Sequence, residues 1–183
     1  MIEIYLEPYE YVRAREIGLE RAERREMYGH RRDIQQAWRT EHRARKMLNV
    51  ETASIAATLT ELAVAKYLGV YWHGHGGHHD PDKRYHKDAD VGDRHEVRTC
   101  ITMGAELKHF SIYEKDVDHR RPTDTIWAGH VPLTDHGRIV YLFGWMYRID
   151  AWRIAEECPS CRVYDDGRSV CLTHLNTHKE NNP

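Results

Sequence analysis

The sequence predicts a mixed α/β (α+β) domain in which helices flank one central mixed β-sheet. Two observations predict this class. Helix-favouring composition dominates residues 9–69, and strand-like segments separated by turn-forming residues follow from residue 94 onward. A further helix is predicted to begin near Asp150. Because helices come first, strands follow and another helix comes later, the order favours one domain built on a single mixed sheet.

An N-terminal helical segment is expected over residues 1–50, packed on the core. Glu, Arg, Gln and Ala are frequent from Pro8 onward and Gly29 interrupts them, which predicts helices at about 9–28 and 32–48. The second predicted helix ends in a basic run made of Arg39, Arg43, Arg45 and Lys46. This run is either a solvated helical face or a surface that contacts DNA phosphates, and both interpretations stay open.

The core is expected over residues 51–175 and begins with a helix at 52–69. This helix is apolar or small almost all round, as a buried helix is, and Gly69 suits its C-terminal end. Glu61 is an acid within it, and a buried carboxylate is costly unless a cation or hydrogen-bond donors compensate. Glu61 therefore needs a partner. A salt bridge to Lys66 or to an N-terminal arginine is one interpretation, and a functional role is the other.

The segment after this helix, residues 70–88, is predicted to form a short strand and then a loop rich in Gly, His and Asp. The irregular spacing of its histidines argues against a dedicated metal site. Strands are predicted within 95–100, 105–113, 123–133, 137–145 and 169–175. The tail, residues 176–183, has no apolar residue and is expected to be disordered.

Composition limits the classes of protein to consider. The chain has 183 residues, 40% of them hydrophobic, which is enough for one core, and its net charge of −2 means that any DNA binding must use local basic patches. It has no apolar run long enough for a membrane and no basic-then-apolar leader, so we expect a cytoplasmic protein without a membrane partner. Whether it forms a homo-oligomer is left open.

Residues 90–98 gather acids beside a base. In an extended segment Glu96 and Arg98 project from one face and Val97 from the other. Asp90 lies a few residues upstream, and Glu61 lies in the buried helix before it. Converging carboxylates beside a cation are what a Mg²⁺ site for phosphodiester chemistry requires, because Mg²⁺ prefers oxygen ligands. The Glu-Val-Arg triplet alone is equally compatible with an ordinary ion pair.

These motifs together resemble the PD-(D/E)XK nuclease superfamily, which has the restriction-endonuclease-like fold, and in particular its small phage proteins. The likeness covers about residues 50–175 and is carried by "TELAVAKYLG" (60–69), "DVG" (90–92), "EVR" (96–98) and "GW" (144–145). The resemblance implies a phage-encoded, Mg²⁺- or Mn²⁺-dependent nuclease that acts on DNA. It makes Asp90 and Glu96 metal ligands, and it makes Glu61 a further ligand or a residue that orients metal-bound water.

The chain departs from this family pattern at two positions. Arg98 stands where the family usually carries Lys, and the residues before Glu61 include no Gly. A guanidinium keeps its charge, so Arg98 would clamp a phosphate rather than help to generate the nucleophile. Asp93 competes with Asp90 for the ligand role, and the D-V-G spacing favours Asp90. The alternative function is a nucleic-acid-binding or protein-interaction module that has lost catalysis.

Three cysteines and a histidine near the C-terminus have spacing that suits zinc. Cys158 and Cys161 form a C-x₂-C pair, and Cys171 and His174 follow as C-x₂-H. Against a zinc site, a regular strand over 169–175 would point Cys171 and His174 to different faces. Zn²⁺ ligands and buried reduced thiols therefore both remain as interpretations, and Cys100 stands apart from this group.

Overall fold

The computed structural model describes residues 1–27, 50–74, 90–100, 109–113, 117, 119–132, 138–163 and 167–177. Within these ranges the elements, in chain order, are β1 (Ile2–Tyr5), α1 (Pro8–Met27), α3 (Val50–Leu68), β2 (His95–Thr99), β3 (His109–Tyr113), β4 (Thr125–His130), β5 (Ile139–Tyr147), α4 (Arg148–Glu157), β6 (Arg162–Val163), β7 (Gly167–Cys171) and the 3₁₀ turn Leu172–His174. Helices and a mixed sheet are both present, so the predicted α+β class is confirmed.

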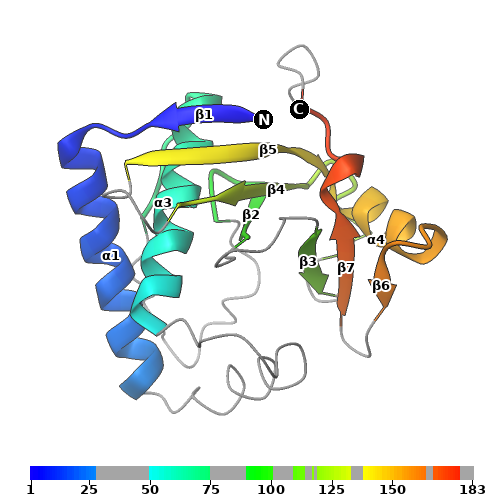
Figure 1. Cartoon of the computed structure of the whole chain (residues 1–183), viewed down its shortest axis with the longest axis horizontal. Coiled ribbons are helices and arrows are strands. Elements are labelled where there is room, and N and C mark those ends of the chain that lie inside the picture. The colour runs from blue at the N-terminus through cyan, green and yellow to red at the C-terminus, as the bar shows by residue number, and fades with distance from the viewer. Residues whose placement is uncertain are drawn as a thin grey trace.

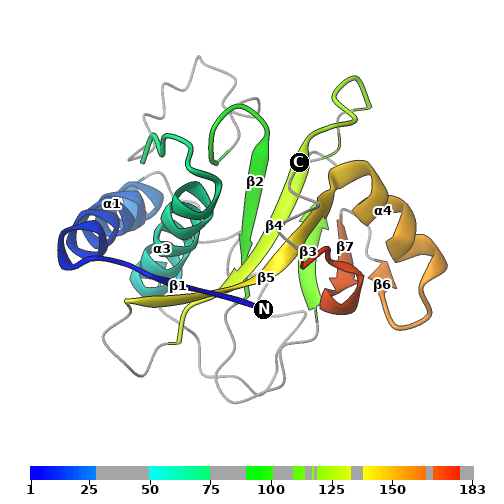
Figure 2. The same ribbon diagram turned by 90° about the horizontal axis from the view of Figure 1, so that it is seen from above.

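The larger sheet has four strands in the order β1-β5-β4-β2. β2 runs parallel to β4, and β5 runs antiparallel to both of its neighbours, β1 and β4. Figure 2 shows α1 and α3 on one side of this sheet and α4 with β3, β6 and β7 on the other. The sheet is therefore covered on both faces, as the mixed-sheet prediction required.

The two faces of the sheet bury separate hydrophobic cores. β4 contributes Trp127 to the core under α1 and α3. Its neighbours Ile126 and Ala128 belong to a second core, under α4, β3 and β7. Because successive side chains of a strand point to opposite faces, this one strand joins the two cores.

A second sheet, with the order β3-β7-β6, lies beside α4 (Figure 1). A single sheet was expected, but the described strands form two. β1 was not predicted, and its pairing with β5 places the N-terminus at the edge of the larger sheet. The strand expected near residue 70 is absent, since residues 70–74 have no regular structure. The helix expected at 32–48 lies outside the described residues.

A close contact between α1 and α3 depends on Gly18. A Cβ atom at Gly18 would lie 2.6 Å from the Cα of Ile55, so a side chain there would push the two helices apart. Thr58 fastens the same contact, because its hydroxyl donates to the carbonyl of Ala14 at 2.8 Å. Arg21 follows Gly18 by about one helical turn, so this close packing brings Arg21 over α3.

Among the described helices, none combines the length and the apolar character needed to cross a lipid bilayer.

Candidate functional site

Glu61 lies on the buried side of α3 and is paired with an arginine. Its side chain is 5% exposed, and both of its oxygens accept hydrogen bonds from Arg21, at 2.5 and 2.9 Å. The indole N–H of Trp72 donates to the same carboxylate at 3.3 Å. The partner that the sequence required is thus an N-terminal arginine, while Lys66 pairs with Glu10 instead at 2.6 Å.

Glu96 and Arg98 lie on the same face of β2, as the alternation predicted. His95 and Val97 are buried, whereas Glu96 and Arg98 are only partly buried. A guanidinium nitrogen of Arg98, Nη1, donates to Oε1 of Glu96 at 2.7 Å. The Cζ atom of Arg98 also lies 5.9 Å from the ring centroid of Tyr113 in β3. Arg98 therefore connects the larger sheet to the smaller one.

Asp90 lies just before β2 and turns toward the same group. Its Oδ2 atom accepts the backbone N–H of Val97 at 2.8 Å and lies 3.9 Å from Nη1 of Arg98. The pKa of the Asp90 carboxyl is raised to about 6, mainly because the group is buried. The negative charge of Glu61 adds to this rise, and the positive charge of Arg98 opposes it. Asp93 is exposed. Of the two acids that compete for the ligand role, Asp90 is the one that lies with Glu96 and Arg98.

Two arginines that the sequence did not single out also belong to this group. Arg21 is one of many arginines in a highly charged helix, so no sequence signal distinguishes it. Arg148 begins α4, and its Nη1 atom lies 4.0 Å from Oε2 of Glu96. Its Nη2 atom bonds to Asp124, and its backbone N–H donates to the Asp124 carbonyl at 2.9 Å. We call Arg21, Glu61, Asp90, Glu96, Arg98 and Arg148 together the carboxylate–arginine cluster.

The donors of the carboxylate–arginine cluster fit a hard divalent cation in their chemistry, because they are carboxylate oxygens. The positions of these donors fit such a cation less well than their chemistry does. Within the described residues, the three acids do not bring three ligand atoms together around one point. Arg98 lies between Asp90 and Glu96, and Arg21 takes both oxygens of Glu61. Asp90 and Glu96 are thus the pair best placed to hold an ion.

The four basic residues predicted to contact DNA, Arg39, Arg43, Arg45 and Lys46, lie outside the described residues.

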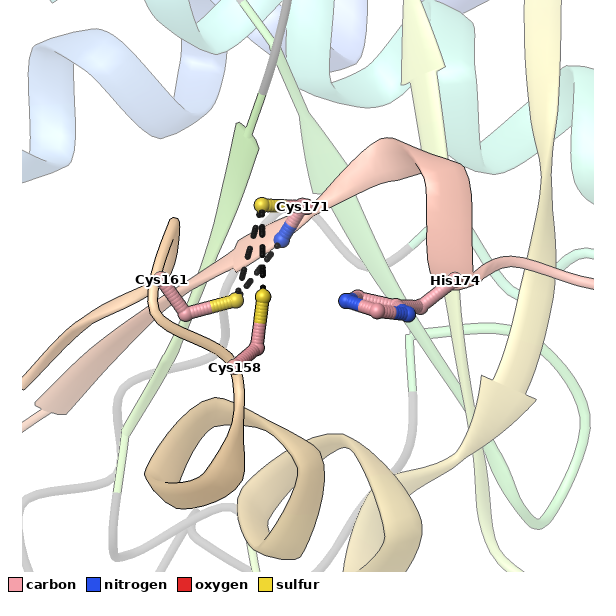
Figure 3. A group of neighbouring side chains, drawn as sticks. All are labelled: Cys158, Cys161, Cys171 and His174. Carbon is pink, nitrogen blue, oxygen red and sulfur yellow. Dashed lines mark hydrogen bonds between the residues drawn. The ribbon is translucent and has the colours of Figure 1, made fainter.

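Cys158, Cys161, Cys171 and His174, which we call the cysteine–histidine cluster, form a compact group. Their ligand atoms all lie within 4.8 Å of one another, so this group can hold a metal ion. Figure 3 shows the four side chains turned toward a common centre from the turn after α4, the end of β7 and the 3₁₀ turn. All four cysteines of the chain are free thiols, and Cys100 is buried elsewhere.

A break in the last strand brings Cys171 and His174 together. β7 ends at Cys171, and the 3₁₀ turn over Leu172–His174 carries the histidine back toward the sulfurs. The prediction of a regular strand over 169–175 was therefore wrong at its end. Because the strand ends at Cys171, Cys171 and His174 are not held on opposite faces, and the objection to a metal site no longer applies.

The sulfur spacing fits a tetrahedral metal. The Sγ atom of Cys171 lies 3.6 Å from that of Cys161 and 4.0 Å from that of Cys158. Two sulfurs on one tetrahedral zinc ion, each about 2.3 Å from it, lie about 3.8 Å apart. A disulfide would need about 2.05 Å. The observed distances therefore match shared ligation of one ion.

The charge balance of the cysteine–histidine cluster also favours a cation. Hydrogen bonds with His174 and Cys161 lower the pKa of the Cys158 thiol to about 6, whereas burial raises the pKa of Cys161 to about 12 and raises that of Cys171. Burial therefore makes a second and a third thiolate costly here, and a bound cation would offset that cost. Within the described residues, the buried Nε2 atom of His174 has no hydrogen-bond partner.

No protein-family model, no curated protein and no solved structure matches this chain.

Proposed function

We propose that this protein is a DNA nuclease of the PD-(D/E)XK type that depends on Mg²⁺ or Mn²⁺. The observation that carries the proposal is that Asp90 and Glu96 lie on either side of Arg98 and that the charge of Glu61 acts on Asp90. Glu61 comes from α3, Asp90 precedes β2, and Glu96 and Arg98 lie within β2. The resemblance in sequence names these same four residues. Burial is the main cause of the raised pKa of Asp90, and the negative charge of Glu61 adds to it, which is consistent with acids held close together away from water.

The acids and two of the arginines of the carboxylate–arginine cluster have different roles in this proposal. Asp90 and Glu96 would hold the ion, which when bound lowers the pKa of a water molecule and offsets charge on the phosphate. Arg21 holds Glu61 in a fixed orientation through two hydrogen bonds. Arg98 keeps its charge at any pH of interest and can donate two parallel hydrogen bonds to phosphate oxygens.

A plasmid-cleavage assay tests the proposal. Supercoiled DNA is incubated with the protein with and without Mg²⁺ or Mn²⁺, and we expect nicking only with the metal. Asp90→Asn and Glu96→Gln remove charge with little change of shape and should abolish cleavage. Asp93→Asn is the matched control, because Asp93 is an exposed acid three residues further on, and it should keep activity. Cleavage that survives in both Asp90→Asn and Glu96→Gln would refute the proposal.

The second candidate is a binding module that has lost catalysis, and the position of Arg98 favours it. A guanidinium between Asp90 and Glu96 can take the place of a metal ion. Calorimetric titration with Mg²⁺ separates the two candidates. Mg²⁺ binding that is abolished by Glu96→Gln supports the nuclease. DNA binding that is changed neither by Mg²⁺ nor by this substitution supports the module.

We also propose that the metal of the cysteine–histidine cluster is Zn²⁺ and that its role is structural. Three cysteines and one histidine complete a tetrahedron, which leaves no open position for a substrate. Free thiols suit a reducing compartment, which supports a cytoplasmic location. Elemental analysis of purified protein should find one zinc ion per chain, and Cys171→Ser should lose it. Cys100→Ser should retain it, and wild-type protein that takes up no zinc would overturn this assignment.

A further inference from the structure

His109 contacts the cysteine–histidine cluster from a distant part of the chain. It is the first residue of β3, and the register of the smaller sheet places it opposite Cys171. Its Nε2 atom lies 3.2 Å from the sulfur of Cys171 and 2.9 Å from the carbonyl oxygen of Ser160. Ser160 lies between Cys158 and Cys161, so one ring nitrogen touches both halves of the cluster.

The partners of His109 fix which nitrogen carries its proton. A carbonyl oxygen only accepts hydrogen bonds, so Nε2 of His109 must be the donor to Ser160. The same N–H faces the sulfur of Cys171, which as a thiolate is a good acceptor. A nitrogen that carries a proton cannot bind a metal. His109 therefore cannot be a ligand through this atom, and His174 completes the ligand set.

We propose that His109 is a positioning residue of the metal centre, which donates its Nε2 proton to the metal-bound sulfur of Cys171 and to the turn that holds Cys158 and Cys161. This inference rests on the proposed zinc site. A hydrogen bond to a ligating group orients that group and tunes the charge that it gives to the metal. The contact also ties β3 to the centre, and the carbonyl of His109 accepts a weak hydrogen bond from Cys100 at 3.5 Å, next to the end of β2.

The test compares metal binding in three histidine variants of the full chain. His109→Ala removes the donor, and we expect the Kd for Zn²⁺, measured by competition with a chromophoric chelator, to rise about 10- to 100-fold. His109→Gln keeps an N–H donor and should recover part of the loss. His130→Ala is the matched control, because His130 also bonds a backbone carbonyl, that of Cys100 at 2.8 Å, but lies outside the cluster. Its Kd should equal that of the wild type.

Cobalt spectra supply a readout that a general loss of stability would not move. Co²⁺-loaded wild type should show thiolate-to-cobalt charge-transfer bands, and we expect these bands to shift in His109→Ala but not in His130→Ala. If wild-type protein binds neither Zn²⁺ nor Co²⁺ through thiolates, the zinc proposal itself fails. If wild type binds both metals and His109→Ala matches His130→Ala, the zinc site stands and the role of His109 is refuted.

A measurement on the unaltered protein covers the case in which His109→Ala does not fold. Nitrogen-15 spectra of the imidazole rings in the zinc-loaded chain report the tautomer of each histidine. We expect His109 to carry its proton on Nε2. A His109 ring protonated only on Nδ1 would overturn the proposal.

Discussion

Arg98 lies between two carboxylates, and this position decides what it can contribute. Its guanidinium is 2.7 Å from Glu96 and 3.9 Å from Asp90, so in the absence of a substrate it neutralises both. When a phosphate approaches, the same group can turn two N–H donors toward it. A lysine at this position would keep the charge and lose the planar pair of donors.

The first prediction concerns Arg98. Arg98→Ala should lower the rate of metal-dependent plasmid cleavage by about 10²- to 10³-fold, because it removes a charge that stabilises the transition state. Mg²⁺ affinity should stay equal or increase, since a neighbouring positive charge is gone. Arg98→Lys should keep activity. If both variants melt at lower temperature and neither changes cleavage, Arg98 is only the structural partner of Glu96.

The second prediction concerns the pair of Arg21 and Glu61. Arg21→Met leaves a carboxylate that is 5% exposed without its guanidinium, so the free energy of unfolding should fall by about 3 to 5 kcal/mol. Urea denaturation measures this. Arg153→Met is the control, because Arg153 pairs with Asp150 at the surface and should cost less than about 1 kcal/mol. Equal losses in the two variants would contradict a special role for the buried pair.

The sequence predicted these residues unequally. Alternation along β2 was enough to place Glu96 and Arg98 on one face, and burial of α3 was enough to require a cation for Glu61. The identity of Arg21 could not be predicted, because it depends on the close approach of two helices at Gly18. Arg148 was missed because its contact with Glu96 joins α4 to β2, two elements that are distant in the chain.

At the scale of elements, Gly144 gives the Gly-Trp motif of β5 a structural reason. Its φ of +141° lies in a region that L-residues avoid, and the register of β4 and β5 shifts nearby. A Cβ atom at Gly144 would lie 2.2 Å from the carbonyl oxygen of Asn176. Asn176 pairs with Trp145 through two backbone hydrogen bonds, of 2.8 and 3.1 Å. Gly144 thus makes room for the chain that follows the 3₁₀ turn.

The third prediction follows from this contact. Gly144→Ala should lower the free energy of unfolding by more than about 2 kcal/mol, because it combines backbone strain with a backbone clash. Gly69→Ala is the matched control, since Gly69 also has positive φ, +68°, but has no atom near an added Cβ. It should cost about 1 kcal/mol. Chemical denaturation compares the two, and an equal cost would contradict the proposed clash.

Some elements were predictable and others were not. The predicted helices that fall on described residues were found within two residues of their ends, because composition marks them locally and Gly69 marks the end of α3. The division of the strands into two sheets depends on which strands pair, and no local signal specifies that. The 3₁₀ turn after Cys171 was missed because "SVCLTHL" has ordinary strand composition. That one turn decides whether His174 can join the cysteines.

At the scale of the whole molecule, the two cores place the two clusters in different surroundings. The cysteine–histidine cluster borders the core of α4 and the smaller sheet. Cys161 of the cluster contributes to this core, and so do Val170 and Leu172, the residues on either side of Cys171. The core under α1 and α3 includes none of its residues. Arg98 bridges the two parts through its contact with Tyr113. The metal should therefore stabilise one half of the molecule more than the other.

The fourth prediction tests this division. Removal of zinc by a chelator should speed hydrogen exchange at the backbone amides of β3, β6 and β7, since the cross-link between α4 and β7 is lost. The amides of α3, β5 and β1 should stay protected. Mass spectrometry of peptides from the exchanged protein reports both regions. Uniform loosening of both halves, or no change in either, would contradict the division.

The most direct test of the nuclease proposal is a crystal structure of the protein soaked with Mn²⁺, with anomalous scattering recorded at the manganese and zinc edges. We expect a manganese ion held by Asp90 and Glu96, with Arg98 moved away from Asp90, and a zinc ion at the cysteine–histidine cluster. A structure at saturating Mn²⁺ with no manganese at these acids, and with Arg98 still between them, would contradict the nuclease proposal and favour the binding module.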